Sequence, residues 1–142
     1  MMDLPSHPFG SELDQHTVAE MLAQHTNWED KYRQLIIWGK RLPSFTDAQK
    51  QAASQVSGCE SDVWFLHHKD AETHYFAADS NARIVKGLLA VVLACVNGQN
   101  HTQIAQLDLN AVFSQAGLAH HLSESRTNGL HAIVQHIHSE IK

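Results

Sequence analysis

Cys59 is the residue of this chain whose type and surroundings are best suited to chemistry. It lies in a short polar segment with Gly58, Glu60 and Ser61, and glycine allows backbone angles that other residues avoid. Such a segment can present a thiol, and the thiolate form of cysteine is a strong nucleophile. A free cysteine is also among the most often buried residue types. A pure interaction module with an inert Cys59 is therefore one alternative.

A reactive Cys59 needs help to ionise. An ordinary cysteine has a pKa of about 8.5, so only a few per cent of it is thiolate at neutral pH. The helix expected before this segment would turn its partly negative C-terminal end toward the thiol, and Glu60 and Asp62 add like charge. We therefore expect stabilisation of the thiolate to come from elsewhere in the fold, either from Arg126 or from the N-terminus of the helix that starts near Asn81.

The second cysteine has a different setting. Cys95 lies in the apolar run 88–96, where a buried and unreactive thiol is expected. Two cysteines in all do not form a disulfide framework, and an iron–sulfur scaffold or a zinc ribbon needs a larger set of thiolate and imidazole ligands. The chain also has no glycine-rich phosphate loop, dinucleotide fingerprint or nucleophile elbow.

Histidine is unusually common, with 12 residues. The sets that invite a metal hypothesis are His67 and His68, His120 and His121, and His131, His136 and His138. On a helix His131 and His138 share a face whereas His136 points elsewhere, and no set has cysteine or carboxylate partners at the spacings of a zinc site. We expect exposed histidines and no metal site. A second alternative remains, a thiol-dependent hydrolase or peroxide reductase that uses Cys59 with a histidine.

Length and charge narrow the class of protein. The 142 residues suit one domain, 1–142. The net charge of −5 disfavours nucleic-acid binding, which depends on clustered Lys and Arg. The run 84–96 is too short to span a bilayer, and the N-terminus lacks the pattern of a signal peptide. We expect a cytoplasmic protein without a membrane or nucleic-acid partner.

Hydrophobic periodicity predicts the elements that must position Cys59. A first helix is expected from Thr17, in a capping box with Glu20, to about His25. A second begins after Asn27 and ends before Pro43, with Glu29, Asp30, Lys31, Arg33 and Lys40 facing water. A third, capped by Thr46 or Asp47, is expected to run into the Cys59 segment.

The pattern then changes to that of strands. Residues 63–66 and 75–76 predict an antiparallel hairpin, and 79–81 offer turn residues and caps for a buried helix over 84–96 that ends at Asn97 and Gly98. A short helix capped by Thr102, another over 109–117 and a last amphipathic helix with Leu130, Ile133, Val134, Ile137 and Ile141 follow. Helices, a hairpin and more helices predict an α+β fold.

Five motifs in order along nearly the whole chain resemble the SufE/CsdE family of sulfur acceptor proteins. Two of them, the lead-in and the Trp28 segment, are closer to the CsdE branch. The motifs are Ser6-His7-Pro8-Phe9-Gly10; Trp28-Glu29-Asp30-Lys31-Tyr32-Arg33-Gln34-Leu35-Ile36; Gly58-Cys59-Glu60 with Val63-Trp64; Asp79-Ser80 through Gly87-Leu88-Leu89-Ala90-Val91; and Ser125-Arg126 with Gly129-Leu130.

The resemblance implies a fold and a mechanism. The fold would be a small antiparallel sheet packed by helices, similar to the IscU-like iron–sulfur scaffolds but without their ligand cysteines. Cys59 would accept sulfane sulfur from a pyridoxal-phosphate cysteine desulfurase, as a persulfide and with no cofactor of its own. It would pass the sulfur to an iron–sulfur scaffold or a tRNA-modification protein. The chain would act as an acceptor rather than as an enzyme.

The resemblance also implies roles for residues around Cys59. Gly58, Glu60, Ser61, Asp79 and Arg126 would support the loop and its docking, and Val63 and Trp64 would help to line a resting pocket for the thiol. Local chemistry offers plainer interpretations for two of these, Asp79 as a helix cap or turn residue and Arg126 as a solvated charge at a helix end.

Asp62 departs from the family pattern, which carries a neutral or basic residue at this position. A charge beside the thiol would alter docking and raise the thiol pKa. On this hypothesis Asp62→Asn should speed alkylation of the thiol at neutral pH.

Overall fold

The computed structural model describes residues 4–58 and 61–142. Its elements in chain order are α1 (Gln15–Gln24), α2 (Trp28–Lys40), α3 (Asp47–Ala52), β1 (Ser54–Gln55), β2 (Val63–Asp70), β3 (Thr73–Ser80), α4 (Arg83–Val96), β4 (Gln99–Asn100), α5 (His101–Ala105), α6 (Leu109–Gln115) and α7 (Glu124–Glu140). The two central strands form the predicted hairpin, and the α+β class is confirmed. The expectation of one domain over 1–142 stays a prediction.

The sheet is antiparallel with strand order β1-β2-β3-β4. The long hairpin pairs Val63 with Ser80 at one end and Asp70 with Thr73 at the other, and Ala71 in its turn has a φ of 53°. The two-residue strand β1 pairs Gln55 with Trp64. The segment that carries Cys59 therefore connects two neighbouring strands.

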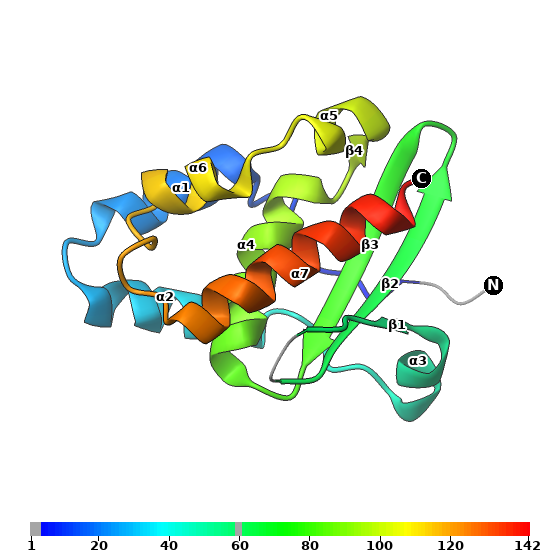
Figure 1. Ribbon diagram of the computed structural model, residues 1–142, viewed down its shortest axis with the longest axis horizontal. Coiled ribbons are helices and arrows are strands. Elements are labelled where there is room, and N and C mark those ends of the chain that lie inside the picture. Colours follow the sequence, from blue (N-terminus) through cyan, green and yellow to red (C-terminus); the bar gives the residue numbers. More distant parts are fainter. Residues whose placement is uncertain (1–3, 59–60) are drawn as a thin grey trace.

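Helix α4 lies at the centre of the molecule (Figure 1). All of its residues from Gly87 to Val96 are buried, which fits an apolar run with no polar face. The hairpin lies on one side of α4 and helices α1, α2 and α6 on the other, while α7 crosses over α4 toward the hairpin (Figure 1). Side chains of α1, α2, α4, α6, α7 and the hairpin share one hydrophobic core.

The structure corrects the predicted start of the first helix. Its N-cap is Asp14, whose side chain accepts a hydrogen bond from the backbone N–H of Thr17, so the helix begins two residues before Thr17 and the predicted capping box is wrong. This hydrogen bond holds the pKa of the Asp14 carboxyl below its ordinary value. The Asn27 cap of α2 is confirmed, with Asp30 as its backbone partner.

Lys31 is buried rather than facing water. It is 5% exposed, and its Nζ donates to the carbonyl oxygen of Leu22 at 2.6 Å and to that of Ala116 at 3.1 Å. Both carbonyls lie at helix C-terminal ends, where the regular helical bonds run out; that of Leu22 also accepts from the His25 N–H at 3.2 Å. The helical pattern alone does not reveal this, because Lys31 is buried by contacts from α1 and from the residue that follows α6.

The third helix is shorter than predicted. Its Thr46 cap is confirmed, in a capping box with Gln49, but it ends at Ala52 and is followed by β1. The chain therefore reaches the Cys59 segment from a strand, not from a helix end. The predicted destabilisation of a thiolate by that helix end does not apply.

Two further caps differ from expectation. Asn100, rather than Thr102, caps α5, and Ala82 precedes α4 without a side-chain cap, because Asp79 and Ser80 belong to β3. Asn97 and Gly98, whose φ is +79°, end α4 as predicted. In the part of the chain that the structure describes, no helix combines the length and hydropathy that crossing a membrane would require.

Candidate functional site

The Cys59 segment is described on both sides of the thiol. Cys59 and Glu60, two of the predicted site residues, lie outside the described residues, whereas Gly58 and Ser61 are placed. Gly58 has a φ of +92°, and a Cβ atom built on it would lie 3.3 Å from the Cβ of Ala132 on α7. The positive φ agrees with the expectation that this position needs glycine. The residue before Cys59 is thereby set against α7.

The base of the segment is closed by backbone hydrogen bonding. The N–H of Val56 donates to the carbonyl oxygen of Val63 at 3.0 Å, which extends the pairing of β1 with β2 by one step. The hydroxyl of Ser80 donates to the carbonyl oxygen of Asp62 at 2.6 Å. Sequence reasoning missed Ser80 as a residue that fixes this segment, because the contact depends on the hairpin register.

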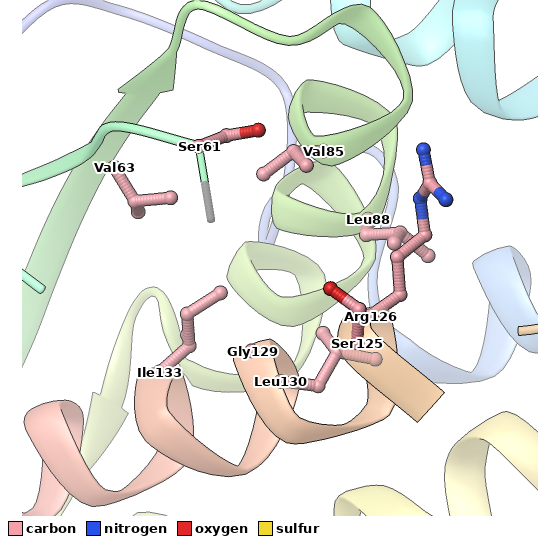
Figure 2. A pocket seen from close by; sticks show the side chains of 9 residues that line it. All are labelled: Ser61, Val63, Val85, Leu88, Ser125, Arg126, Gly129, Leu130 and Ile133. Atoms are coloured by element: carbon pink, nitrogen blue, oxygen red, sulfur yellow. The ribbon is translucent and has the colours of Figure 1, made fainter. Parts of the chain in front are cut away.

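A pocket of about 60 Å³ lies beside the segment, between α4 and α7 (Figure 2). A water molecule occupies about 30 Å³ in the liquid, so the pocket suits the end of a side chain rather than a metabolite. Most of its walls are apolar, with hydroxyls from Ser61 and Ser125. The residues that line it are Ser61, Val63, Val85, Leu88, Ser125, Arg126, Gly129, Leu130 and Ile133.

Val63 lines this pocket as predicted, whereas Trp64 does not. Successive side chains of a strand point to opposite faces of the sheet. Trp64 accordingly packs on the other face, against a small cluster of Phe45, Leu66 and Ala77, and the Lys50 Nζ lies 4.6 Å from the centre of its ring. The prediction that Trp64 lines the pocket is wrong.

Arg126 provides a positive charge at the pocket. It lies in the first turn of α7, which begins after its cap Ser123, and its exposed side chain extends alongside α4 (Figure 2). Within ranges 4–58 and 61–142 its guanidinium has no acidic partner within salt-bridge distance. Ser61 and Arg126, two of the predicted site residues, line the same pocket, but the Arg126 guanidinium lies beyond Leu88, on the side away from Ser61 (Figure 2).

Asp79 takes a different place. It is 4% exposed and does not line the pocket. Its Oδ2 accepts a 2.8 Å hydrogen bond from the N–H of Phe45, and its Oδ1 lies 3.2 Å from the Nζ of Lys86. Asp79 thus ties β3 to α4 and to the chain before α3, and it is not a helix cap.

Cys95 is buried, as predicted. Its residue surface is 5% exposed, and burial raises the pKa of its thiol to about 12. Such a thiol is almost wholly protonated at neutral pH, so it is a poor nucleophile. This leaves Cys59 as the candidate for thiol chemistry.

The histidines do not gather at the pocket. None of its nine described lining residues is a histidine. His120, His121 and His131 are exposed as expected, but the side chains of His67 and His136 are only 16% and 18% exposed. The expectation of exposed histidines is wrong for these two and for His74, which is 2% exposed, and His68 and His138 are half-buried. No group of three or more His, Cys, Asp or Glu in the described ranges is arranged to hold a metal ion.

His67 and His136 belong to a polar network where the C-terminal half of α7 meets the sheet. His136 Nε2 lies 2.7 Å from the hydroxyl of Ser54 and 3.2 Å from Glu140. His67 Nδ1 lies 3.8 Å from Glu140, and its Nε2 lies 2.8 Å from His74 Nδ1. Burial is the largest cause that lowers the pKa of His67 and of His74.

Comparison with known proteins gives a consistent family match. Residues 16–141 match SufE, the Fe-S metabolism associated domain. The chain is 41% identical over 133 residues to the sulfur acceptor protein CsdE of Escherichia coli strain K12, covering 92% of this chain and 90% of that protein. It is 40% identical over 120 residues to an uncharacterized SufE-like protein of Rhizobium etli, covering 82% of this chain and 81% of the relative.

A solved structure shares the fold. The solution structure of a hypothetical protein from Thermus thermophilus matches with a TM-score of 0.73, at 12% identity, over 89% of this chain and 92% of that one. At this identity the likeness bears on the fold alone.

Proposed function

Because this chain belongs to the SufE family, we propose that it is a sulfur acceptor for a cysteine desulfurase. Cys59 receives sulfane sulfur from a pyridoxal-phosphate desulfurase as a persulfide and passes it to a second protein. The name of the Escherichia coli relative, sulfur acceptor protein, supports this role. The similarity to CsdE agrees with the branch expected from the lead-in and Trp28 segments.

The pocket beside the Cys59 segment is the observation that carries the proposal. Ser61 and Val63, two and four residues after Cys59, line it directly, and Gly58 is set against the same helix that forms its far wall. A persulfide is readily reduced by free thiols in exchange reactions. A small, largely apolar pocket beside the segment that carries Cys59 is suited to shelter one sulfur atom from such attack.

The transfer step is an exchange at sulfur. The thiolate of Cys59 attacks the outer sulfur of the persulfide on the desulfurase. A bond forms between Cys59 Sγ and that sulfur, while the bond between the outer sulfur and the desulfurase cysteine breaks. The desulfurase cysteine leaves as a thiolate, so the step requires no oxidant or reductant. A second exchange of the same kind unloads Cys59 onto the recipient.

Arg126 is the one cationic residue among the nine described residues that line the pocket. A positive charge near a thiol lowers its pKa, and Arg126 stands at the pocket without an acidic partner among the described residues. We assign it the role of stabilising the Cys59 thiolate and persulfide anion. Ser61 and Gly58 shape the segment, and the supporting roles of Glu60 and Asp79 remain predictions from the family resemblance.

The proposal is tested by intact mass spectrometry after incubation with a cysteine desulfurase and cysteine. Wild type, Cys59→Ser and Cys95→Ala are compared. We expect a gain of one sulfur atom, removed by a reducing agent, on wild type and Cys95→Ala but not on Cys59→Ser. Cys95→Ala is the matched control because it removes the only other thiol.

Two results would reject the carrier role. If no variant gains sulfur while Cys59 alkylates readily, a thiol-dependent enzyme becomes the better interpretation, and activity without a partner protein should then be found. If Cys59→Ser changes only stability, the chain is an interaction module. The identity of the recipient, an iron–sulfur scaffold or a tRNA-modification protein, and the cytoplasmic location remain part of this proposal.

A further inference from the structure

Both the side chain and the backbone of Asp62 form hydrogen bonds, although the residue is exposed. Its Oδ1 accepts a hydrogen bond from Gln55 Nε2 at 3.1 Å, and its Oδ2 accepts one from Asn81 Nδ2 at 3.4 Å. Its backbone N–H donates to Asn81 Oδ1 at 3.2 Å, and its carbonyl oxygen accepts the Ser80 hydroxyl. Asn81 therefore contacts Asp62 at two points, once as donor and once as acceptor.

These contacts join the two sides of the Cys59 segment. Gln55 is the last residue of β1, and Asn81 lies between β3 and α4. Asp62 stands directly before β2, so its carboxylate connects the strand that enters the segment with the turn that leads into a pocket-lining helix. Together with the hydrogen bond from Val56 to Val63, the Asp62 carboxylate joins the two ends of the Cys59 segment. These contacts fix the backbone at Asp62, three residues after Cys59 in the sequence.

We infer that Asp62 is a positioning residue for sulfur transfer through Cys59, acting by its hydrogen bonds to Gln55 and Asn81 rather than by its charge. This inference rests on the proposed carrier function. Transfer between two sulfur atoms needs an in-line approach of the thiolate to its target, and small misplacements of a reacting group slow such steps strongly. A fixed base limits the positions from which Cys59 meets a docked partner.

The inference contrasts with the electrostatic hypothesis for Asp62. A role through charge acts on the thiol pKa and would be lost equally in Asp62→Asn and Asp62→Ala. A role through hydrogen bonds is lost in Asp62→Ala and in Asn81→Ala, and the latter leaves the carboxylate in place. Asp62→Asn retains an oxygen for the Gln55 amide and should keep part of the effect.

The test measures the pH profile of Cys59 alkylation by iodoacetamide, and kcat and KM for sulfur transfer from a desulfurase. Asp62→Ala, Asp62→Asn and Asn81→Ala are compared with the parent, all carrying Cys95→Ala so that one thiol reacts. We expect Asp62→Ala and Asn81→Ala to lower kcat of transfer by about three- to tenfold, because a misplaced reacting group slows such a step, and to change the plateau rate of alkylation as well. The apparent pKa of alkylation should stay close to that of the parent. Because the lost hydrogen bonds also lower the melting temperature somewhat, both assays are run at a temperature at which every variant is fully folded.

Several results would overturn the inference. If Asn81→Ala behaves as the parent while both Asp62 variants shift the apparent pKa equally, Asp62 acts by charge. If all variants only lower the melting temperature, its role is structural. Should the parent itself accept no sulfur, the carrier function fails, but the alkylation plateau still decides whether Asp62 and Asn81 position the thiol.

Discussion

Gly87 on α4 lies directly against the backbone of Leu35 on α2. A Cβ atom on Gly87 would come within 2.7 Å of the carbonyl carbon of Leu35, and one on Gly39 within 2.9 Å of the backbone nitrogen of Gly87. The two helices therefore meet backbone to backbone. This close crossing sets the position of α4, which carries Val85 and Leu88 to the pocket.

Gly87→Ala should destabilise the protein by about 1–3 kcal/mol, since the added methyl group forces a backbone shift. Alanine in an uncrowded helix would instead stabilise by up to about 1 kcal/mol, so the sign of the change is informative. Urea unfolding of wild type and variant measures the difference. A variant as stable as wild type would mean that the crossing can open without loss.

Lys31→Met should lower the free energy of unfolding by about 1–3 kcal/mol, because the carbonyls of Leu22 and Ala116 lose a buried charged donor. Lys40→Met is the matched control, since Lys40 is exposed on the same helix and its loss should change stability little. Both are measured by denaturant unfolding. Equal effects of the two substitutions would show that the Lys31 contacts contribute nothing specific.

Asp79→Ala should destabilise by roughly 3 kcal/mol, because it leaves the largely buried Lys86 without its carboxylate and the Phe45 N–H without an acceptor. Asp79→Asn keeps an acceptor oxygen and should lose less. Asp70→Ala, at the exposed end of the hairpin, serves as control. If Asp79 also supports docking, Asp79→Asn will raise KM for the desulfurase at temperatures where it is fully folded.

Arg126→Gln should raise the apparent pKa of Cys59, because it removes the positive charge that we propose stabilises the thiolate. The pH dependence of iodoacetamide alkylation measures it. Arg83→Gln makes the same change of charge on the exposed first turn of α4, at a residue that does not line the pocket, and should change the pKa less. Equal shifts in both variants would point to net charge rather than to a local role of Arg126.

Stability should fall as the pH drops below about 6.5, the ordinary pKa of histidine. Burial lowers the pKa of His67 and His74 in the folded state, so the unfolded chain binds protons more readily. Their stabilising contribution is present above the unfolded pKa and is lost as the pH falls through the lower folded value. After burial, the charge of His74 lowers the pKa of His67 most, followed by His68 and Lys69, while Glu140 opposes the shift. For His74, Lys69 and His101 lower the pKa and Glu72 opposes the shift.

Melting temperatures between pH 7 and pH 5 check this dependence. His74→Asn should make the melting temperature less sensitive to pH, whereas His131→Asn, on an exposed ring, should not. A His74 variant with the same slope as wild type would place the pH dependence elsewhere.

Local patterns predicted much of the fold. The Asn27 and Thr46 caps, the hairpin and the buried helix α4 each depend on residues close in sequence, and the structure confirms them. The errors have tertiary causes. Residues 54–55 continue a helical pattern but pair with Phe65 and Trp64, and Lys31 is buried by carbonyls from two other parts of the chain.

At the candidate site, too, local sequence predicted some residues, and contacts that form only in the folded structure explain the rest. Gly58, Ser61, Val63 and Arg126 were predicted near the thiol from composition and family resemblance, and the last three line one pocket. Gln55, Ser80 and Asn81 were not predicted as partners of Asp62, because a strand end and a turn meet there only after the sheet has formed. The prediction that Trp64 lines the same pocket as Val63 is wrong, because successive side chains of a strand point to opposite faces of the sheet.

Five of the nine pocket-lining residues belong to α7, beginning at Ser125, which is made 66 positions after Cys59. At the usual pace of translation, about 5–20 residues per second, this gap corresponds to about 3–13 s. A nascent chain thus carries its thiol for several seconds before the wall of the pocket exists.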